Sequence, residues 1–216
     1  MPRVRRLRDG DAPHGMANMR TALLLSGGMD SIAIAFWKRP GVAITVDYGQ
    51  RPALAEIRAA SAVCEELDIE HHIISADLSA LGSGDMAGTA PASLAPVTEW
   101  WPFRNQMLVT LAAMKAVGLG VTQIMIGTLR TDGQHADGTP AFIDAMNGLL
   151  ACQEGALKLE APAIALNASE LIAKAGVPPE ILAWAHSCHV ANEACGQCRG
   201  CKKHYETLEE LGFDPY

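Results

Sequence analysis

Short apolar runs alternate with segments of helical spacing from residue 21 to about residue 180, and this alternation limits the fold more than any other feature. The predicted strands cover residues 21–25, 42–48, 71–77, 122–128 and 157–164, and the predicted helices cover residues 31–38, 53–67, 105–117, 142–152 and 169–175. Strands that alternate with helices form parallel sheets through right-handed crossovers. We therefore predict an α/β domain with a doubly wound parallel sheet over residues 21–180.

Two details of the core follow from the same spacing. In the second predicted helix, the apolar positions indicate a buried stripe made of Leu54, Ile57, Val63 and Leu67. Two cysteines, Cys64 and Cys152, fall in helical segments far from the other four, so we expect both to be inert core thiols.

The segments outside the alternating pattern are expected to differ from it. Residues 1–20 carry five arginines among Gly, Pro and Asp and have no apolar stretch, so we expect a disordered basic arm rather than a secretion signal. Residues 78–99 are rich in Gly, Ala, Ser and Pro, which is typical of a long loop that is either mobile or functional. Residues 181–216 hold four of the six cysteines, and we predict that they form a separate C-terminal segment.

Charge and hydropathy argue against two classes of function. The net charge of -7 disfavours binding of nucleic acid by bulk electrostatics. No apolar run reaches the ~20 residues that a membrane span requires. Because nothing in the sequence suggests export either, we expect a cytoplasmic protein with small-molecule partners and no contact with membranes.

The stretch "LLLSGGMDS" joins the first predicted strand to the first predicted helix, where ligands bind in open α/β sheets. Gly27 and Gly28 allow close backbone approach to an anion and a positive φ, and the free N–H groups at a helix start point at that anion. Ser26 and Ser31 can add hydroxyl donors, and Asp30 can hold a Mg²⁺ that bridges phosphate oxygens. The pattern is neither a Walker A loop nor a dinucleotide fingerprint. The alternative is an ordinary strand-to-helix turn with a capping serine.

"SGGMDS" resembles the signature loop of the PP-loop ATP pyrophosphatases. This resemblance implies an adenine-nucleotide α-hydrolase-like fold in which the loop grips pyrophosphate. It also implies that ATP is cleaved between its α and β phosphates while a carboxylate or carbonyl-like oxygen is activated as an adenylate. Relatives that transfer sulfur to tRNA fit less well, because no reactive cysteine lies near the loop and the charge is acidic.

Two further motifs narrow the resemblance to the QueC family, the 7-cyano-7-deazaguanine synthases of the queuosine pathway. "VDYGQRPALAEIRAA" places Asp47 and Tyr48 at the end of the second strand, where an adenine ring or ribose would lie. "PFRNQM" opens a helix with Arg104 and Asn105, a pair that the family carries near nucleotide and substrate. A plain turn, an N-cap asparagine and a solvated arginine remain the alternative for these positions.

Four cysteines near the end of the chain have the spacing of a metal site. Cys188, Cys195, Cys198 and Cys201 follow the pattern C-x6-C-x2-C-x2-C, and four thiolates at such spacing can close a tetrahedral Zn²⁺ site. A closed site of this kind is structural, and the family has one of this spacing. Disulfides and an iron–sulfur cluster are the alternatives, although disulfides are rare in the cytosol.

The chain departs from the family where the substrate would bind. The family usually has a Tyr-Pro-Asp-Cys-Arg stretch, of which this chain retains acidic residues at Asp132 and Asp137. Four other family positions are changed: Gly138 and Thr139 replace the Cys and Arg, Ala168 replaces a Lys, and His204 replaces an Arg. Losing these cations weakens the expected grip on a carboxylate or on developing charge.

The resemblance implies an enzyme that adenylates 7-carboxy-7-deazaguanine and lets ammonia or an amine attack the adenylate, which gives an amide or a nitrile and releases AMP and pyrophosphate. ATP would be a substrate and Mg²⁺ a cofactor. Asp30, Arg104 and Asp132 would then be catalytic, and Arg104, Asn105, Asp132 and Asp137 would bind the substrate. Two other functions stay open: a divergent ligase that joins the deazaguanine to an amine, including one on a protein acceptor, and a zinc-stapled nucleotide-binding module without catalysis. A homodimer is also left open.

Overall fold

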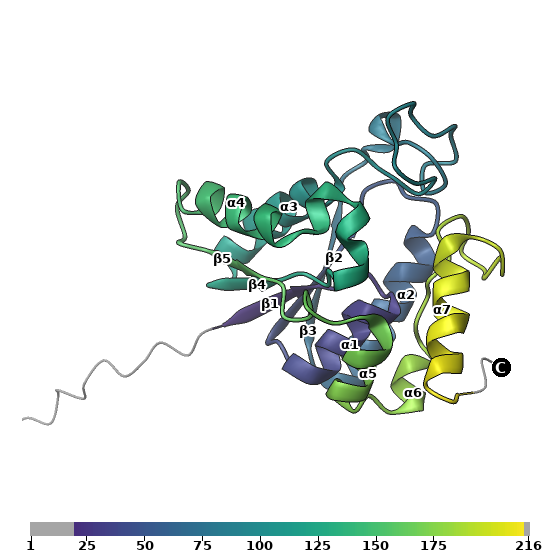
Figure 1. Ribbon diagram of the computed structural model, residues 1–216. Coiled ribbons are helices and arrows are strands. Elements are labelled where there is room, and N and C mark those ends of the chain that lie inside the picture. Colours follow the sequence, from purple (N-terminus) through teal and green to yellow (C-terminus); the bar gives the residue numbers. More distant parts are fainter. Residues whose placement is uncertain (1–19, 214–216) are drawn as a thin grey trace, which may run out of the picture.

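The five strands of the sheet all run parallel, which confirms the predicted doubly wound α/β class (Figure 1). The computed structural model describes residues 20–213. The strands are β1 (Thr21–Leu24), β2 (Val42–Asp47), β3 (Glu70–Ser75), β4 (Gln123–Met125) and β5 (Lys158–Glu160), in the spatial order β3-β2-β1-β4-β5.

Helices cover both faces of this sheet. The α-helices are α1 (Met29–Lys38), α2 (Ala53–Leu67), α3 (Arg104–Gly118), α4 (Pro140–Leu150), α5 (Ala168–Ala175), α6 (Pro179–Leu182) and α7 (Arg199–Glu210). Three short 3-10 helices, η1 (Ser79–Leu81), η2 (Arg130–Gln134) and η3 (Ala136–Gly138), lie in the connections. The apolar core on one face joins α3 and α4 to the sheet, and the core on the other face joins α1, α2, α5, α6 and α7 to it.

The first strand shows how the sequence builds these two layers. Successive side chains of a strand point to opposite faces of a sheet. Ala22 and Leu24 therefore pack under α3 and α4, whereas Leu23 and Leu25 pack against α1 and α2. Leu23 is fully buried, and burial of a leucine side chain contributes roughly 1.5–3 kcal/mol. A strand that is apolar on both faces can only lie inside a sheet covered on both sides.

The strand order places a topological switch point between β1 and β4. From β1 the chain proceeds through α1 and α2 toward β3, and it then returns through α3 to β4 and β5 on the other side. In open parallel sheets, ligands bind in the crevice beyond the carboxyl ends of the strands at such a point. The loop after β1 and the loop after β4 both open into this crevice.

Most predicted elements are found with small shifts of their bounds. The second predicted helix has the bounds 53–67 that the periodicity gives, and α1 begins at Met29 rather than at residue 31. Strands β4 and β5 are shorter than the predicted runs 122–128 and 157–164. The residues that follow β4, Ile126 to Thr128, line the crevice instead of extending the strand. After β5, Ala161, Ala163 and Ile164 pack in or against the apolar cores.

Two expectations about the core are wrong. Leu54 is 61% exposed, because the first turn of α2 directs this position to solvent while Ala53 and Ala55 are buried in its place. Cys152 is exposed, because α4 ends at Leu150 and the thiol lies in the following turn. Cys64 is buried, as expected.

The chain ends described by the structure are anchored to the body. The predicted basic arm lies outside the described residues except for Arg20, whose Nη1 donates a hydrogen bond to the Leu119 carbonyl at 2.7 Å. At the other end, Leu208 of α7 belongs to the apolar core, and Leu211 and Phe213 pack against it. Among residues 20–213, no helix has both the length and the apolar character needed to cross a membrane.

Candidate functional site

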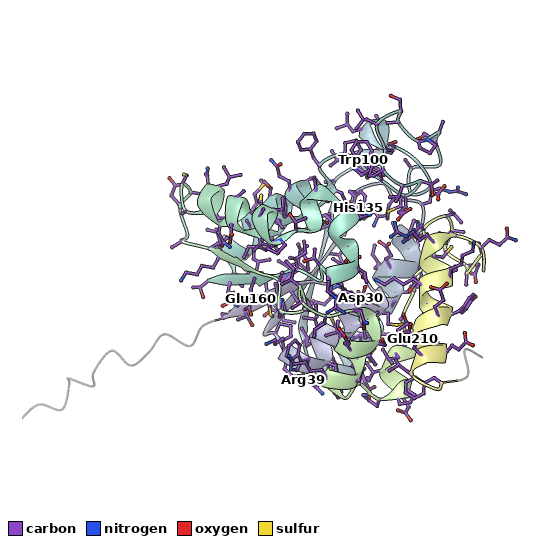
Figure 2. The ribbon with its side chains drawn as sticks, viewed as in Figure 1. Asp30, Arg39, Trp100, His135, Glu160 and Glu210 are labelled. Atoms are coloured by element: carbon purple, nitrogen blue, oxygen red, sulfur yellow. The ribbon has the colours of Figure 1, made fainter. Side chains whose placement is uncertain are left out.

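A cleft of about 300 Å³ opens at the switch point, a volume at the lower end of the ~300–1,000 Å³ of small-molecule sites. Its walls come from the loop after β1, the start of α3, the η2 and η3 region, and the segment from His186 to Thr207. Asp30 and His135, both among its lining residues, lie toward the middle of the molecule between the sheet and α7 (Figure 2). The cleft therefore combines segments that are far apart in the sequence.

The loop after β1 holds one glycine in a conformation that other residues rarely adopt. Gly27 has φ +74°, and a Cβ there would lie 2.4 Å from the Glu56 carbonyl oxygen. Gly28 has an ordinary φ of -78° and is the N-cap of α1. Of the two glycines that were expected to need conformational freedom, only Gly27 has a positive φ. Gly27 shapes the turn, and Gly28 faces the cleft.

The start of α1 is free to bind an anion. Gly28 has no capping side chain, so no described side-chain oxygen occupies the first amides of α1 as a helix cap. Ser26 Oγ lies 3.3 Å from the Gly28 amide and 3.1 Å from Ser31 Oγ, which donates to the Gly28 carbonyl at 2.9 Å. These contacts hold two hydroxyl groups beside the helix start. The arrangement suits a phosphate group.

Asp30, in the first turn of α1, forms an ion pair that the sequence did not reveal. Its Oδ2 lies 2.7 Å from Lys203 Nζ of α7. Burial alone would lower the pKa of Lys203, but the carboxylates of Asp30 and Asp132 outweigh it and raise that pKa. The second oxygen, Asp30 Oδ1, is buried and has no hydrogen-bond partner among the described residues. An unpaired carboxylate oxygen in a cleft suits a hard cation such as Mg²⁺.

The motif after β2 builds a buried polar wall. Gln50 accepts from the Tyr48 amide at 2.8 Å and donates to Glu56 Oε2 at 2.7 Å. Burial raises the pKa of Glu56 to about 7, although the hydrogen bond from Gln50 and the charge of Arg104 oppose this shift. Tyr48 packs edge-on against Trp101 with ring centroids 4.9 Å apart. Tyr48 and Glu56 thereby reach the cleft with fixed orientations.

Two of the residues predicted to bind substrate, Asn105 and Asp137, are hydrogen-bonded to each other. The Asn105 amide donates to Asp137 Oδ2 at 3.0 Å, and Asn105 Nδ2 donates to the Asp137 carbonyl at 2.8 Å. Asp137 thus fixes the start of α3, and with it Arg104, whose Nη1 lies 3.0 Å from Met86 Sδ. Asp132 Oδ2 accepts from the Leu129 amide at 2.9 Å, and Asp132 lines the cleft.

The structure brings most of the predicted ligand-binding residues to this one cleft. Its lining includes Ser26, Gly28, Asp30, Ser31, Tyr48, Arg104, Asn105 and Asp132. Three predicted residues, Gly27, Asp47 and Asp137, are not among the lining residues. Asp47 Oδ1 accepts from the Gly49 amide at 3.0 Å, so in this structure it orders the turn after β2.

The structure explains some of the four residues at which this chain departs from the family pattern. A Cβ at Gly138 would lie 2.9 Å from the Asp132 carbonyl oxygen, so the η3 turn leaves little room for a side chain. Thr139 is the N-cap of α4 and accepts from the Phe142 amide at 3.3 Å. Ala168 is buried at the start of α5, and His204 lies in the cleft with Nδ1 3.0 Å from Ser187 Oγ.

Several charged and imidazole groups in the cleft were not expected from the sequence. They are Glu99, His135, His186, His189, Arg199 and Lys203. Glu99 comes from the long loop before α3, and Arg199 and Lys203 come from the helix that follows the cysteines. The pair of lysines after Cys201 was a signal of local positive charge, but no spacing rule connects it to a loop at residue 30.

The four C-terminal cysteines form a cluster that fits a single tetrahedral ion. Their Sγ atoms all lie within 4.8 Å of one another. The Cys195–Cys201 distance is 3.9 Å and the Cys188–Cys198 distance is 4.0 Å, close to the ~3.8 Å that tetrahedral Zn–S bonds of ~2.3 Å imply. Backbone amides point at the sulfurs, including His189 N to Cys198 Sγ at 3.4 Å. Such donors stabilise thiolates.

The parallel sheet, the glycine turn after β1 and the uncapped start of α1 define this chain as an α/β nucleotide-binding protein of the PP-loop type. Its fold resembles that of the U34-tRNA thiolase NcsA from Methanococcus maripaludis, with a TM-score of 0.52, 19% identity, and coverage of 90% of this chain and 66% of that one. At this identity the likeness shows the fold alone.

Sequence comparison identifies the family. The profile described as "Queuosine biosynthesis protein QueC" matches residues 20–212. The 7-cyano-7-deazaguanine synthase of Desulforudis audaxviator is 34% identical, over 86% of this chain and 94% of that protein. The enzyme of the same name from Methanococcus maripaludis is 30% identical, over 91% and 97% of the two chains. The chain therefore belongs to the QueC family, and it is an enzyme of the ATP-dependent ligase class to which these synthases belong.

Proposed function

We propose that the chain adenylates 7-carboxy-7-deazaguanine with ATP and transfers the activated acyl group to ammonia or another amine, releasing AMP and pyrophosphate. The observation that carries this proposal is the uncapped start of α1 beside the Asp30–Lys203 pair, in a cleft that also holds Arg104. Relatives named as 7-cyano-7-deazaguanine synthases support the choice of substrate.

In the first half-reaction, a carboxylate oxygen of the substrate attacks the α-phosphorus of ATP, and the bond between that phosphorus and the bridging oxygen breaks. Pyrophosphate leaves, and an acyl-adenylate remains. The Gly28 side of the loop and the α1 amides would bind the departing pyrophosphate. Arg104 and Lys203 would offset the negative charge that gathers around the reacting phosphates.

Asp30 is the residue of this chain best suited to hold Mg²⁺, because Oδ1 is buried without a partner and Oδ2 is already paired. Bound Mg²⁺ would neutralise phosphate charge and fix phosphate geometry. Lys203 would keep Asp30 in place and supply a second positive charge from the opposite wall.

In the second half-reaction, an amine attacks the acyl carbon, AMP leaves with the electron pair of the broken C–O bond, and the new amide nitrogen loses a proton. With ammonia, the product is the primary amide. Nitrile formation then needs a second ATP, because the amide oxygen must be adenylated before it can leave as AMP. The protein contributes mainly position and charge to these steps.

A second candidate product is an amide conjugate that goes no further. Thr139 serves as a helix cap where the family usually has an arginine, and the η3 turn excludes a side chain at Gly138. A cation that could grip the amide oxygen during its activation is therefore missing from these positions. On this reading the amide accumulates, and the acceptor is any amine that fits, including one on a protein.

The cysteine cluster would hold a structural Zn²⁺. Its four thiolates leave no open ligand position, and its sulfur spacing fits one ion. A four-iron cluster would spread its thiolates more widely, since the cluster itself occupies the space between them. The metal would therefore order the segment that delivers Arg199 and Lys203 to the cleft.

The test is incubation of the protein with ATP, Mg²⁺ and 7-carboxy-7-deazaguanine, with and without ammonium, followed by pyrophosphate assay and mass spectrometry. We expect pyrophosphate release that depends on the carboxylate, and an amide that depends on ammonium. Prompt nitrile formation would support the complete synthase reaction and contradict the second candidate. Absence of pyrophosphate with this carboxylate would contradict the proposed function.

A further inference from the structure

One carboxylate in the cleft has no role in the chemistry described above. Glu99 lies in the loop between β3 and α3 and is only 4% exposed. Its Oε1 accepts from Arg199 Nη1 at 2.7 Å. Its Oε2 is buried and has no hydrogen-bond partner among residues 20–213. A buried carboxylate oxygen without a donor is costly, so the protein retains it for a reason outside its own fold.

No neighbouring side chain supplies the missing donor. His135 Nε2 lies 3.9 Å from Glu99 Oε1, the oxygen that already pairs with Arg199, and among the described residues Oε2 has no hydrogen-bond partner. His189 has the same deficit, because its Nδ1 is buried without a partner. Both imidazoles line the cleft together with Glu99. The two unpartnered polar atoms therefore belong to the same ligand site.

The loop holds Glu99 firmly in this position. The Asp85 amide donates to the Thr98 carbonyl at 2.8 Å, and Thr98 Oγ1 donates to Asp85 Oδ2 at 2.7 Å. On the other side, Trp101 is 3% exposed and packs against Tyr48. With anchors both before and after it, the Glu99 carboxylate cannot easily turn away to solvent. Its free oxygen is a preorganised acceptor.

We infer that Glu99 recognises the hydrogen-bond donor edge of the deazaguanine base by accepting, through Oε2, a hydrogen bond from the exocyclic 2-amino group. This edge carries two adjacent donors and no acceptor, so no atom along it repels a carboxylate oxygen. At the corresponding positions adenine has the acceptor N1 and a C2–H group, so a carboxylate would face an acceptor and find no N–H donor. The inference rests on the proposed function and adds the residue that would select the base.

The position of Arg199 explains why only one face of Glu99 is available. Arg199 approaches Oε1 from α7, and its side chain is 43% exposed, so this ion pair lies at the rim of the cleft. The pair orients the carboxylate and leaves Oε2 toward the buried end. Arg199 is therefore a positioning residue, and Glu99 is the residue that would touch the base.

The test compares two ligands and two variants by calorimetric binding. The ligands are 7-carboxy-7-deazaguanine and the analogue in which hydrogen replaces the 2-amino group. In Glu99→Gln, Arg199 would still require the side-chain oxygen, so the amide NH₂ would stand where Oε2 was and would face the substrate donors. We expect the unchanged protein to prefer the amino-bearing ligand by about ten- to a hundredfold, and Glu99→Gln to lose most of that preference while its ATP affinity is kept.

Arg199→Met is the matched variant, because it removes the ion pair and leaves the Glu99 carboxylate. We expect it to retain the preference for the 2-amino group even if overall binding weakens. If Glu99 only anchored the loop through Arg199, the two variants would behave alike, and that result would overturn the inference. So would equal binding of the two ligands by the unchanged protein. Failure to bind either ligand would instead overturn the proposed function, and this inference with it.

Discussion

Lys203 is the residue whose position adds most to the chemistry. It comes from α7, yet its Nζ lies 2.7 Å from Asp30 at the other end of the chain. The family has a lysine at the position of Ala168, where this chain has none. Ala168 and Lys203 line the same shallow groove beside the cleft. The positive charge that the family places at the start of α5 is therefore supplied in this chain by Lys203 of α7.

Replacing this cation should slow the chemical step. We expect Lys203→Met to lower carboxylate-dependent pyrophosphate release by about a hundredfold, since the loss of one preorganised donor to developing charge commonly costs ~10²–10³ in rate. Lys203→Arg should retain part of the activity. The matched control is Lys202→Met, because Lys202 is exposed and does not line the cleft. Equal rates in Lys202→Met and Lys203→Met would contradict this role.

Glu56 should make the stability of the protein depend on pH. Its pKa in the folded protein is about 7, against 4.5 as the ordinary value, and burial is the main cause. The folded state therefore binds more protons than the unfolded state between about pH 4.5 and pH 7, and Glu56 destabilises the fold as pH rises through that window. Arg104 and the hydrogen bond from Gln50 limit the effect, whereas the charge of Asp47 adds to it.

The measurement is thermal unfolding of Glu56→Gln at several pH values. The amide keeps the shape and can still accept from Gln50 without a charge. We expect the variant to be more stable than the unchanged protein at pH 8, by on the order of 1–3 kcal/mol, and the difference to vanish near pH 4.5. A difference that stays constant across this range would show that Glu56 does not titrate in the window.

At the scale of elements, local rules gave most of the fold. The apolar runs at 21–25 and 42–48 predict buried strands because both faces are apolar, and α2 has the predicted bounds 53–67. Predictions from local spacing were wrong near the ends of two helices. Cys152 lies beyond the end of α4 rather than inside it, and Leu54 lies on the solvent side of the first turn of α2.

The loop after β1 assigns different tasks to its two glycines. A Cβ at Gly27 would meet the Glu56 carbonyl oxygen at 2.4 Å in a left-handed conformation, so we expect Gly27→Ala to destabilise the protein by about 2 kcal/mol or more. A Cβ at Gly28 would meet Ser26 Oγ at 3.4 Å and the His186 carbonyl oxygen at 3.8 Å, at an ordinary φ. Gly28→Ala should therefore keep its melting temperature and lose ATP affinity, because the new methyl group faces the cleft.

Thermal unfolding and ATP titration of the two variants test this division. Because the substitution is the same at adjacent positions, each variant is the control for the other. Unchanged ATP affinity in Gly28→Ala would indicate that the loop is only a turn. Equal loss of stability in both variants would contradict the separate tasks of the two glycines.

At the scale of the whole molecule, the cleft is assembled from parts that sequence spacing cannot bring together. The loop at residues 26–31 could be predicted because strand, turn and helix are contiguous. Glu99 and Lys203 could not, because their positions depend on how the long loop and α7 pack over the sheet. The cysteine spacing predicted a metal site, but it gave no sign that the adjoining helix would complete the cleft.

The metal should therefore matter for both stability and activity. The cysteine cluster fixes the start of α7, since Cys198 is its N-cap and Cys201 lies in its first turn. That helix carries Arg199 and Lys203 into the cleft and packs Leu208 into the core. When metal binding is coupled to folding, loss of the metal lowers the free energy of unfolding directly. We expect about one Zn²⁺ per chain, and destabilisation of the C-terminal region by several kcal/mol in Cys198→Ser.

Elemental analysis, thermal unfolding and pyrophosphate release measured on the same samples check this expectation. The control is Cys152→Ser, which removes an exposed thiol outside the cluster and should leave all three measurements unchanged. In Cys198→Ser, zinc content, melting temperature and turnover should fall together, because one segment holds the metal and supplies Lys203. If the samples contained iron in place of zinc, the metal would be iron, and the predicted link between metal content, stability and turnover would still hold. Full turnover in protein free of both metals would show that α7 reaches the cleft without the cluster, and would contradict the prediction.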